Sequence, residues 1–291
     1  MIEQILEKLK VEYDFGEIIG EPVYPKQGLS SAVFFLKFST GKEVVVKYGD
    51  CVDKDLLYIK LINENRLGVE VPEIYGYFQI DNIHILLLEK IKGKLFGDVE
   101  RDDLPKYFDT VISTLQELHK LKKKENNWKQ YLSDIFNGKT INWDEVLERK
   151  MVDKNLLQSS LQKIKEIINN LDFEDKETSL LHTDFNQSNL FIEEKTFKIT
   201  GVIDWEEAVF GDPVYDYARF HLHLWHREVD KNIINNFLEQ LNLNNTQKKN
   251  EKMYFLFFVL HYIAYYSESS DEFRIQRVKT HQDFLRNNFT K

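Results

Sequence analysis

The first third of the chain alternates short apolar runs with polar turns. Residues 33–38 and 43–48 are two such runs, rich in β-branched and aromatic side chains and separated by the turn at 39–42. Runs of this length and composition, bounded by turn residues, predict strands that pair as neighbours. An apolar stripe at 55–65 has helical spacing instead. About five antiparallel strands and one helix are therefore expected, with the strand-like runs at residues 18–20, 33–38, 43–48, 69–78 and 83–89.

From about residue 94 onward the spacing changes. Apolar residues recur every three or four positions, which is typical of helices that bury one face. Residues 126–150 are polar and are expected to form a loop. A short amphipathic helix is also expected at 2–13, ahead of the first strand. The helical segments of the remainder lie at residues 108–119, 156–168, 217–225, 233–241, 253–266 and 274–289.

This division predicts an α+β fold with two lobes. Residues 1–91 would form an N-terminal lobe around a five-stranded antiparallel sheet, and residues 92–291 a larger, mostly helical C-terminal lobe. The junction near residue 92 contains no long polar linker. We expect the two lobes to be joined directly.

Composition and charge restrict the classes of protein and of binding partner that are expected. The chain has 291 residues, of which 42% are hydrophobic and 30% charged, as in ordinary globular proteins. Its net charge of −9 argues against a nucleic-acid partner, which usually meets a basic surface. The negative charge is compatible with a cationic small-molecule partner, although a solvated acidic surface explains it equally well. We expect a monomer.

The sequence also predicts where the protein works. Cys51 is the single cysteine, so no intrachain disulfide can form, and a reducing cytoplasm is the expected location. Residues 1–10 lack the apolar core of a signal peptide. The longest apolar stretch, 253–266, is too short to cross a bilayer and predicts a buried helix.

The candidate chemistry lies in residues 180–205. Two short apolar runs flank a loop that carries Asp184 and Asn189, and the second run closes with Asp204. A turn at 193–196 makes this region a predicted hairpin. One carboxylate to face a hydroxyl, with an amide and a second carboxylate to hold a hard cation, is a minimal set for metal-assisted phosphoryl transfer. Taken singly, each residue is also a common turn residue.

The arrangement of these residues resembles a known family. His182-Thr-Asp184, followed by Asn189 and then Ile203-Asp204-Trp205, is similar to the Brenner motif of the aminoglycoside phosphotransferases. Those enzymes are small-molecule kinases built like protein kinases. The stretch from Gly201 to Pro213, followed by Tyr215 and Asp216, is similar to the hygromycin B and macrolide phosphotransferases.

The resemblance implies a role for each residue of the motif. Asp184 would orient or deprotonate the acceptor hydroxyl. Asn189 and Asp204 would bind Mg²⁺. His182 would support the loop, and Asp216 would accept hydrogen bonds from its backbone. The bilobal protein-kinase-like fold follows from the same resemblance.

The resemblance also implies a nucleotide site in the first lobe. Lys47 would contact the α- and β-phosphates of ATP, with GTP as an open alternative. Asp55 falls at the position of its acidic partner, where relatives mostly have Glu, and Glu64 is a second candidate. The other expected contacts are Gly28, Ser30 and Ser31 in a small-residue turn, which read alone is a plain hairpin loop, and Glu89 and Ile91 in the hinge.

The prediction of an acceptor site depends on fewer residues. Family members bind cationic aminoglycosides through carboxylates of the helical lobe. For residues 268–272 a solvated loop is the simpler interpretation. The candidate acceptor carboxylates are Glu206, Glu207, Glu268, Asp271 and Glu272.

These observations predict an ATP- and Mg²⁺-dependent O-phosphotransferase that modifies an aminoglycoside such as hygromycin B and so confers antibiotic resistance. A metabolic kinase for choline, homoserine or a sugar is the main alternative, since its nucleotide site would look the same. A catalytically silent, kinase-shaped binding protein is a third possibility.

Overall fold

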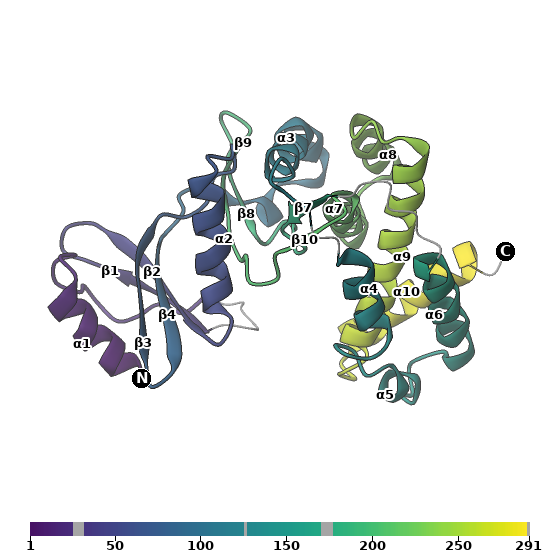
Figure 1. The fold of residues 1–291 in the computed structure, drawn as a ribbon, viewed down its shortest axis with the longest axis horizontal. Helices are drawn as coiled ribbons and strands as arrows, with labels where there is room; N and C mark the ends of the chain where they lie inside the picture. Colours follow the sequence, from purple (N-terminus) through teal and green to yellow (C-terminus); the bar gives the residue numbers. More distant parts are fainter. Residues whose placement is uncertain (26–31, 125–126, 170–176, 290–291) are drawn as a thin grey trace. The chain divides into compact units, whose positions relative to one another are not determined.

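The computed structural model describes residues 1–25, 32–124, 127–169 and 177–289 (Figure 1). The chain folds into two compact units. The first comprises Met1–Leu118 with Asn186–Ala208, and the second comprises His119–Phe185 with Val209–Lys291. The predicted boundary near residue 92 does not coincide with this division, and as a boundary between nucleotide and acceptor lobes it stays a prediction.

The first unit is built on an antiparallel sheet with the strand order β1-β2-β4-β3. The tight connections β1–β2 and β3–β4 make two hairpins, as the alternation of apolar runs and turns predicted. Helix α2 packs against β2 and β4. The elements are α1 (Ile2–Glu12), β1 (Ala32–Lys37), β2 (Glu43–Gly49), α2 (Val52–Glu64), β3 (Ile74–Ile80) and β4 (Ile83–Glu89).

One face of this sheet forms a hydrophobic core with α1. The buried side chains alternate along β1 and β2, as expected for strands with one covered face. Ile5 and Leu9, one turn apart on α1, complete the same cluster. The sheet residues that pack with them include Phe34, Leu36, Val44, Val46, Ile85 and Leu87.

The predicted five-stranded sheet has four strands in the described part of the chain. The segment that would be the fifth makes only isolated bridges, from Ile18 to Phe38 and from Val23 to Phe35. Pro22 lies between these two bridges. A proline has no N–H to donate to a ladder, so it interrupts regular pairing at this edge.

A smaller antiparallel sheet, β5-β8-β9, also belongs to the first unit. The hairpin β8–β9 is the one predicted around the turn at 193–196, and α3 packs against β9. Pairing of β5 with β8 brings residues 186–208 to the first unit, although they are distant in sequence from β5. The elements are β5 (Lys94–Leu95), α3 (Phe108–Leu118), β8 (Leu190–Glu193) and β9 (Lys198–Val202), with 3₁₀ turns at Phe96–Asp98 and Arg101–Tyr107.

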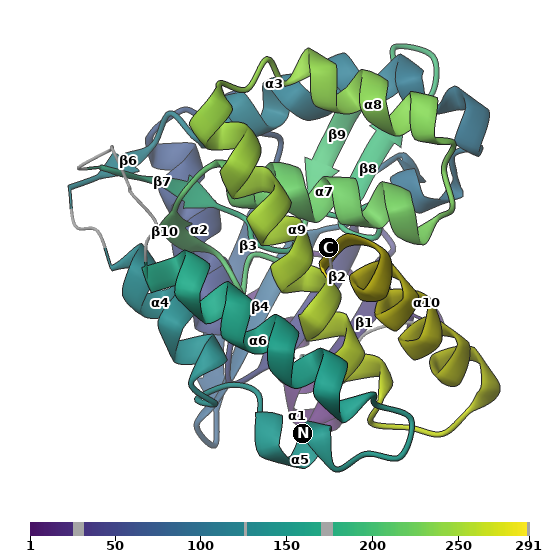
Figure 2. The same cartoon turned by 90° about the vertical axis from the view of Figure 1, so that its right-hand side faces the viewer.

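The second unit is mostly helical. Figure 2 shows α9 passing between α6, α7 and α10, and all three pack against it. A small sheet, β10-β7-β6, completes the unit. The elements are β6 (Lys122–Lys123), α4 (Trp128–Phe136), α5 (Trp143–Leu147), α6 (Lys154–Asn169), β7 (Thr178–Leu181), β10 (Val209–Gly211), α7 (Val214–His226), α8 (Lys231–Gln240), α9 (Asn245–Tyr266) and α10 (Glu272–Phe289).

The loop predicted for residues 126–150 is wrong, because α4 and α5 occupy most of it. Trp128, Leu132, Ile135 and Phe136 are all buried. Their spacing places them on one helix face. The segment was predicted as a loop because its overall composition is polar, and composition does not report this spacing. The α+β class itself is confirmed. Among the helices of the described residues, none has both the length and the apolar character needed to span a bilayer.

Candidate functional site

A lysine surrounded by three carboxylates is the main polar feature of the first unit. Lys47 Nζ lies 2.5 Å from Asp55 Oδ2, 2.7 Å from Asp204 Oδ1 and 3.2 Å from Glu206 Oε2. Lys47, Asp55 and Glu206 are buried, whereas the Asp204 side chain is 35% exposed. We call Asp55, Asp204 and Glu206 the carboxylate cluster. It pairs Lys47 with Asp55, as expected from the sequence.

Separate elements supply these groups. Lys47 is on β2, flanked by β1 and β4, so its backbone is fixed by pairing on both sides. Asp55 lies in the first turns of α2, directly after that strand. Asp55 Oδ1 also accepts a hydrogen bond of 2.6 Å from the backbone N–H of Trp205. One carboxylate therefore links the lysine to the segment that carries Asp204.

The backbone at Asp204 adopts a conformation that is uncommon for a residue with a side chain. Its φ angle is 70°, in the left-handed region. Trp205, the next residue, is fully buried and donates its indole N–H to the carbonyl oxygen of Val202 at 3.0 Å. The buried indole and the bond to Asp55 hold this turn in place, and strain of this kind persists only where surrounding contacts fix it.

The charges of the cluster stabilise one another. Burial alone would lower the pKa of Lys47, but Asp55 and Asp204 raise it above its ordinary value. Burial raises the pKa of the Asp55 carboxyl, and Lys47 acts against that rise. The lysine is therefore a fixed ammonium at neutral pH.

Asn189 lies at the same end of the β8–β9 hairpin as Asp204. Its carbonyl oxygen accepts a hydrogen bond of 3.0 Å from the N–H of Ile203, the residue before Asp204. Asn189 is buried. The backbone of the hairpin thus brings the predicted amide and carboxylate ligands to one end of one element.

The donor set of the carboxylate cluster suits a hard divalent cation. Asp55, Asp204 and Glu206 each have an oxygen that lies within 4.8 Å of the others. Carboxylate and amide oxygens are the ligands that Mg²⁺ takes in proteins, usually one or two carboxylates together with water and phosphate oxygens. Asp204, the most exposed member, is the one that solvent and a ligand can reach.

Asp184 belongs to the second unit, where it pairs with an arginine. Arg219 donates from Nη2 at 2.5 Å and from Nε at 3.1 Å, both to Asp184 Oδ1. Burial by itself would raise the pKa of Asp184, but Arg219 and, to a smaller extent, His223 and His182 hold it at about 2. The carboxylate is therefore ionised at every physiological pH. The sequence analysis missed Arg219, because no motif marks it on α7.

The backbone before Asp184 is held by Asp216. This buried carboxylate accepts N–H groups from His182 at 3.0 Å and from Thr183 at 2.8 Å, and it faces His119 Nε2 at 3.1 Å. Thr183 has a φ of 65°, so the loop turns sharply here. These are the contacts expected for Asp216 in supporting the loop.

The predicted nucleotide contacts outside the carboxylate cluster are only partly described. Glu89 ends β4, and its N–H bonds to the carbonyl oxygen of Glu73 at 2.8 Å. Ile91 packs closely against Gly201, where an added Cβ would lie 2.7 Å from Ile91 Cγ2. Gly28, Ser30 and Ser31 lie outside the described residues.

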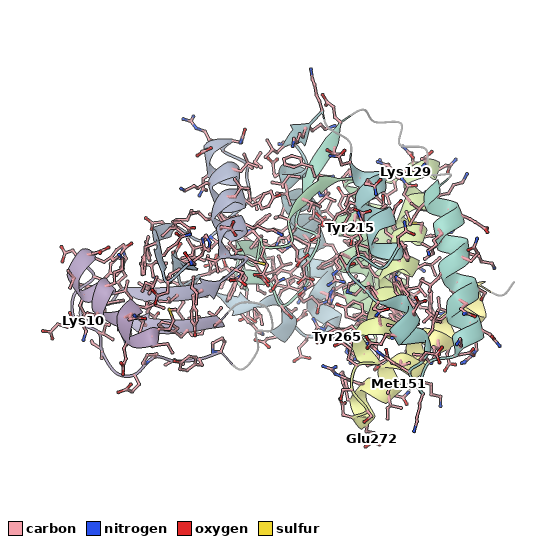
Figure 3. The ribbon with its side chains drawn as sticks, turned by 60° about the horizontal axis from the view of Figure 1, so that its bottom comes forward. Lys10, Lys129, Met151, Tyr215, Tyr265 and Glu272 are labelled. Atoms are coloured by element: carbon pink, nitrogen blue, oxygen red, sulfur yellow. The ribbon has the colours of Figure 1, made fainter. Side chains whose placement is uncertain are left out.

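The predicted acceptor carboxylates fall in both units. Glu206 contacts Lys47, and Glu207 is exposed nearby in the first unit. The other three, Glu268, Asp271 and Glu272, are exposed in the second unit, and Figure 3 labels Glu272 at the outer edge of the ribbon. Asp271 accepts the N–H of Arg274 at 2.9 Å, so it caps the start of α10. That contact explains Asp271 without a ligand.

Comparison with known sequences decides the family. The sequence pattern of the phosphotransferase enzyme family APH matches residues 27–250. The chain belongs to this family. The resemblance drawn from residues 182–216 is therefore confirmed.

Solved structures confirm the kinase-like fold. The chain is similar to the aminoglycoside phosphotransferase APH(4)-Ia in a ternary complex with ADP and hygromycin B, with a TM-score of 0.75, 14% identity, and coverage of 99% of this chain and 98% of that one. It is also similar to the amicoumacin kinase hAmiN in complex with AMP-PNP, Ca²⁺ and Ami. There the TM-score is 0.71, the identity 11%, and the coverage 99% and 93%.

Curated relatives are larger proteins. Acyl-CoA dehydrogenase family member 11 from Homo sapiens is 24% identical over 175 residues, which cover 56% of this chain and 22% of that protein. The corresponding protein of Mus musculus is 25% identical over 223 residues, covering 69% of this chain and 28% of that protein. The chain therefore spans about a quarter of the length of these relatives.

Proposed function

We propose that this phosphotransferase transfers the γ-phosphoryl group of ATP to a hydroxyl of a small molecule, in a reaction that depends on Mg²⁺. The observation that carries the proposal is the convergence of Lys47 with Asp55 and Asp204. A buried ammonium held between carboxylates, one of them accessible, provides both a phosphate contact and a cation ligand. The nucleotides bound in the similar structures support the same assignment.

Each residue has a distinct task in this reaction. Lys47 would contact the nucleotide phosphates, and Asp55 would hold the ammonium in place. Asn189 and Asp204 would bind Mg²⁺, which supplies positive charge to neutralise the phosphate oxygens. Gly28, Ser30, Ser31, Glu89 and Ile91 would complete the nucleotide site, with residues 1–91 as the nucleotide lobe and 92–291 as the acceptor lobe.

Asp184 would act on the acceptor. The acceptor oxygen forms a bond to the γ-phosphorus, the bond from that phosphorus to the bridging oxygen of ADP breaks, and the hydroxyl proton leaves toward the Asp184 carboxylate. With a pKa of about 2, Asp184 is a weak base. Its main contribution is therefore to accept a hydrogen bond and orient the hydroxyl, which suits a loose transition state.

The first acceptor class to test is an aminoglycoside. Hygromycin B in the similar APH(4)-Ia complex supports this choice, and phosphorylation would then confer resistance. Glu207, Glu268 and Glu272 are exposed carboxylates available to a polycation. The relevant cellular compartment would be the cytoplasm, and the protein would act as a monomer.

A metabolic acceptor is the second candidate, favoured by the Asp184–Arg219 pair. The guanidinium and the carboxylate are 2.5 Å apart. Their opposite charges cancel, so the pair carries no net charge. Asp184 would then orient a hydroxyl without attracting an ammonium group beside it. A sugar or another uncharged or anionic metabolite suits this arrangement better than a polycation, whereas choline, a quaternary ammonium ion, gains nothing from it.

A product screen separates these possibilities. The purified protein, with ATP and Mg²⁺, is incubated with pooled aminoglycosides and, separately, with pooled hydroxylated metabolites, and products are detected by the mass of an added phosphate. We expect a phosphorylated product in one pool and none when a chelator replaces Mg²⁺. ATP binding with no product from either pool would contradict the proposal and favour a silent binding protein.

A further inference from the structure

Arg219 donates two hydrogen bonds to Asp184 in the second unit. It lies on α7, three residues after Asp216, which accepts the N–H groups of His182 and Thr183 just before Asp184. Its Nε and Nη2 both reach Asp184 Oδ1, at 3.1 and 2.5 Å. Two donors from one rigid guanidinium hold this oxygen in place and favour the charged carboxylate.

The guanidinium is itself held by α9. Its central carbon lies 5.0 Å from the ring centre of Phe258 and 5.2 Å from that of Tyr262. The Arg219 side chain is only 13% exposed. Contacts of this kind restrict the orientation of an arginine, so α9 helps to position Arg219. Arg219 in turn positions Asp184 through its two hydrogen bonds.

Other titratable groups face the pair from three elements. His182 precedes Asp184 in its loop, His223 lies one turn after Arg219 on α7, and His261 and Tyr262 face it from α9. Burial lowers the pKa of His223 to about 3 and that of His261 to about 4, so both are uncharged at neutral pH. Arg219 is the permanent cation of this group.

We propose that Arg219 is a positioning residue for Asp184, which it holds in one orientation and in its ionised form. This role rests on the phosphotransferase function proposed above. An oriented carboxylate can align an acceptor hydroxyl before transfer, and misplacement of such a group costs about 10²-fold in rate. The arginine itself contacts neither nucleotide nor phosphate in this account.

Arg149 provides a matched control in the same unit. It is a similarly buried arginine, 19% exposed, and it bonds the carbonyl oxygen of Ala264 at 2.7 Å and Ser267 Oγ at 2.9 Å. Its contacts support the end of α9. Loss of Arg149 therefore reports the cost of removing a buried arginine that does not touch Asp184.

The first measurement follows the ionisation of Asp184. The protein is labelled with ¹³C at aspartate carboxyls, and Asp184→Asn assigns the signal. We expect Arg219→Gln to raise the pKa of Asp184, because burial raises it and the strongest opposing charge is then missing. Arg219→Lys should restore most of the shift, and Arg149→Gln should leave the signal unchanged. An unchanged Asp184 titration in Arg219→Gln would overturn the proposal.

The second measurement is kinetic. We expect Arg219→Gln to lower kcat by about 10²-fold, as estimated for misplacement, while KM for ATP stays constant and the acid limb of kcat/KM moves to higher pH. Arg149→Gln should not move that limb. If kcat falls equally in both variants and the acid limb of the kcat/KM profile does not move, the role of Arg219 is structural only. If the wild type transfers no phosphate, the proposed function fails, whereas the carboxyl titration still decides whether Arg219 controls Asp184.

Discussion

Replacing Lys47 by methionine tests whether the carboxylate cluster depends on the lysine charge. Methionine keeps most of the apolar stem but removes the ammonium from Asp55, Asp204 and Glu206. Lys47 and Asp55 are 8% and 1% exposed, and their charged atoms are 2.5 Å apart. Removing one partner of such a buried pair costs about 3–5 kcal/mol, because the other charge stays buried without compensation.

Most of this effect should come from the two buried carboxylates, Asp55 and Glu206. The Asp204 side chain is 35% exposed, so water screens its charge and its pair with Lys47 contributes less. Because the folded pKa of Lys47 is raised, this stabilisation is fully present at neutral pH and is lost only as the pH rises through that folded value. Unfolding measured between pH 7 and 8 therefore reports the full stabilisation by the Lys47 ammonium.

The assay is urea unfolding of Lys47→Met, Asp55→Asn and the double variant. We expect the double variant to be more stable than the sum of the single effects predicts, with a coupling of about 1–3 kcal/mol. Mg²⁺ should stabilise Lys47→Met more than the wild type, because the cation can replace the missing ammonium.

A surface lysine of the same unit is the control. Lys90 pairs with Glu43 at 2.8 Å, and both side chains are about two-fifths exposed. Lys90→Met should cost less than about 1 kcal/mol. The reasoning is refuted if Lys47→Met is no more destabilising than Lys90→Met, or if its effect simply adds to that of Asp55→Asn.

Three further predictions concern the loop, the cation and acid stability. Asp216→Ala leaves two buried backbone N–H groups of the loop without their acceptor, at about 1–3 kcal/mol each, so calorimetry should show a clearly lower Tm. Asp204→Asn should abolish most stabilisation by Mg²⁺ in thermal unfolding, and an unchanged Mg²⁺ effect would remove Asp204 from the cation site. Burial lowers the pKa of His223 to about 3 and of His261 and His281 to about 4, so the unfolded chain binds protons first as the pH falls. Tm should therefore drop between pH 6.5 and 4, and a flat profile there would contradict the buried neutral histidines.

The sequence was sufficient for features that depend on local pattern. Apolar runs and turns predicted the four strands β1 to β4 and the β8–β9 hairpin, which places Asn189 and Asp204 at one end. The family register gave Asp55 and Glu64 as candidates for the acidic partner of Lys47, and Asp55 lies 2.5 Å from it. In each case the spacing along the chain, or along a known motif, determines the spatial neighbour.

The missed features depend on contacts that no local pattern encodes. Arg219 and Asp184 are 35 positions apart, and they meet where the hydrogen bonds of His182 and Thr183 to Asp216 hold the loop against α7. Glu206 was predicted as an acceptor carboxylate, and its contact with Lys47 at 3.2 Å was not predicted. Helices α4 and α5 were missed because the composition of residues 126–150 is polar overall. The helical spacing of four apolar residues on α4 was overlooked.

The central claim is that this chain transfers phosphate through Asp184, and isosteric substitution tests it most directly. On the best acceptor of the product screen, kcat is measured for the wild type and for Asp184→Asn, with ATP affinity determined in parallel. We expect kcat to fall by about 10²–10⁴-fold in Asp184→Asn, while ATP binds with unchanged affinity. Equal turnover in the two proteins would contradict the account.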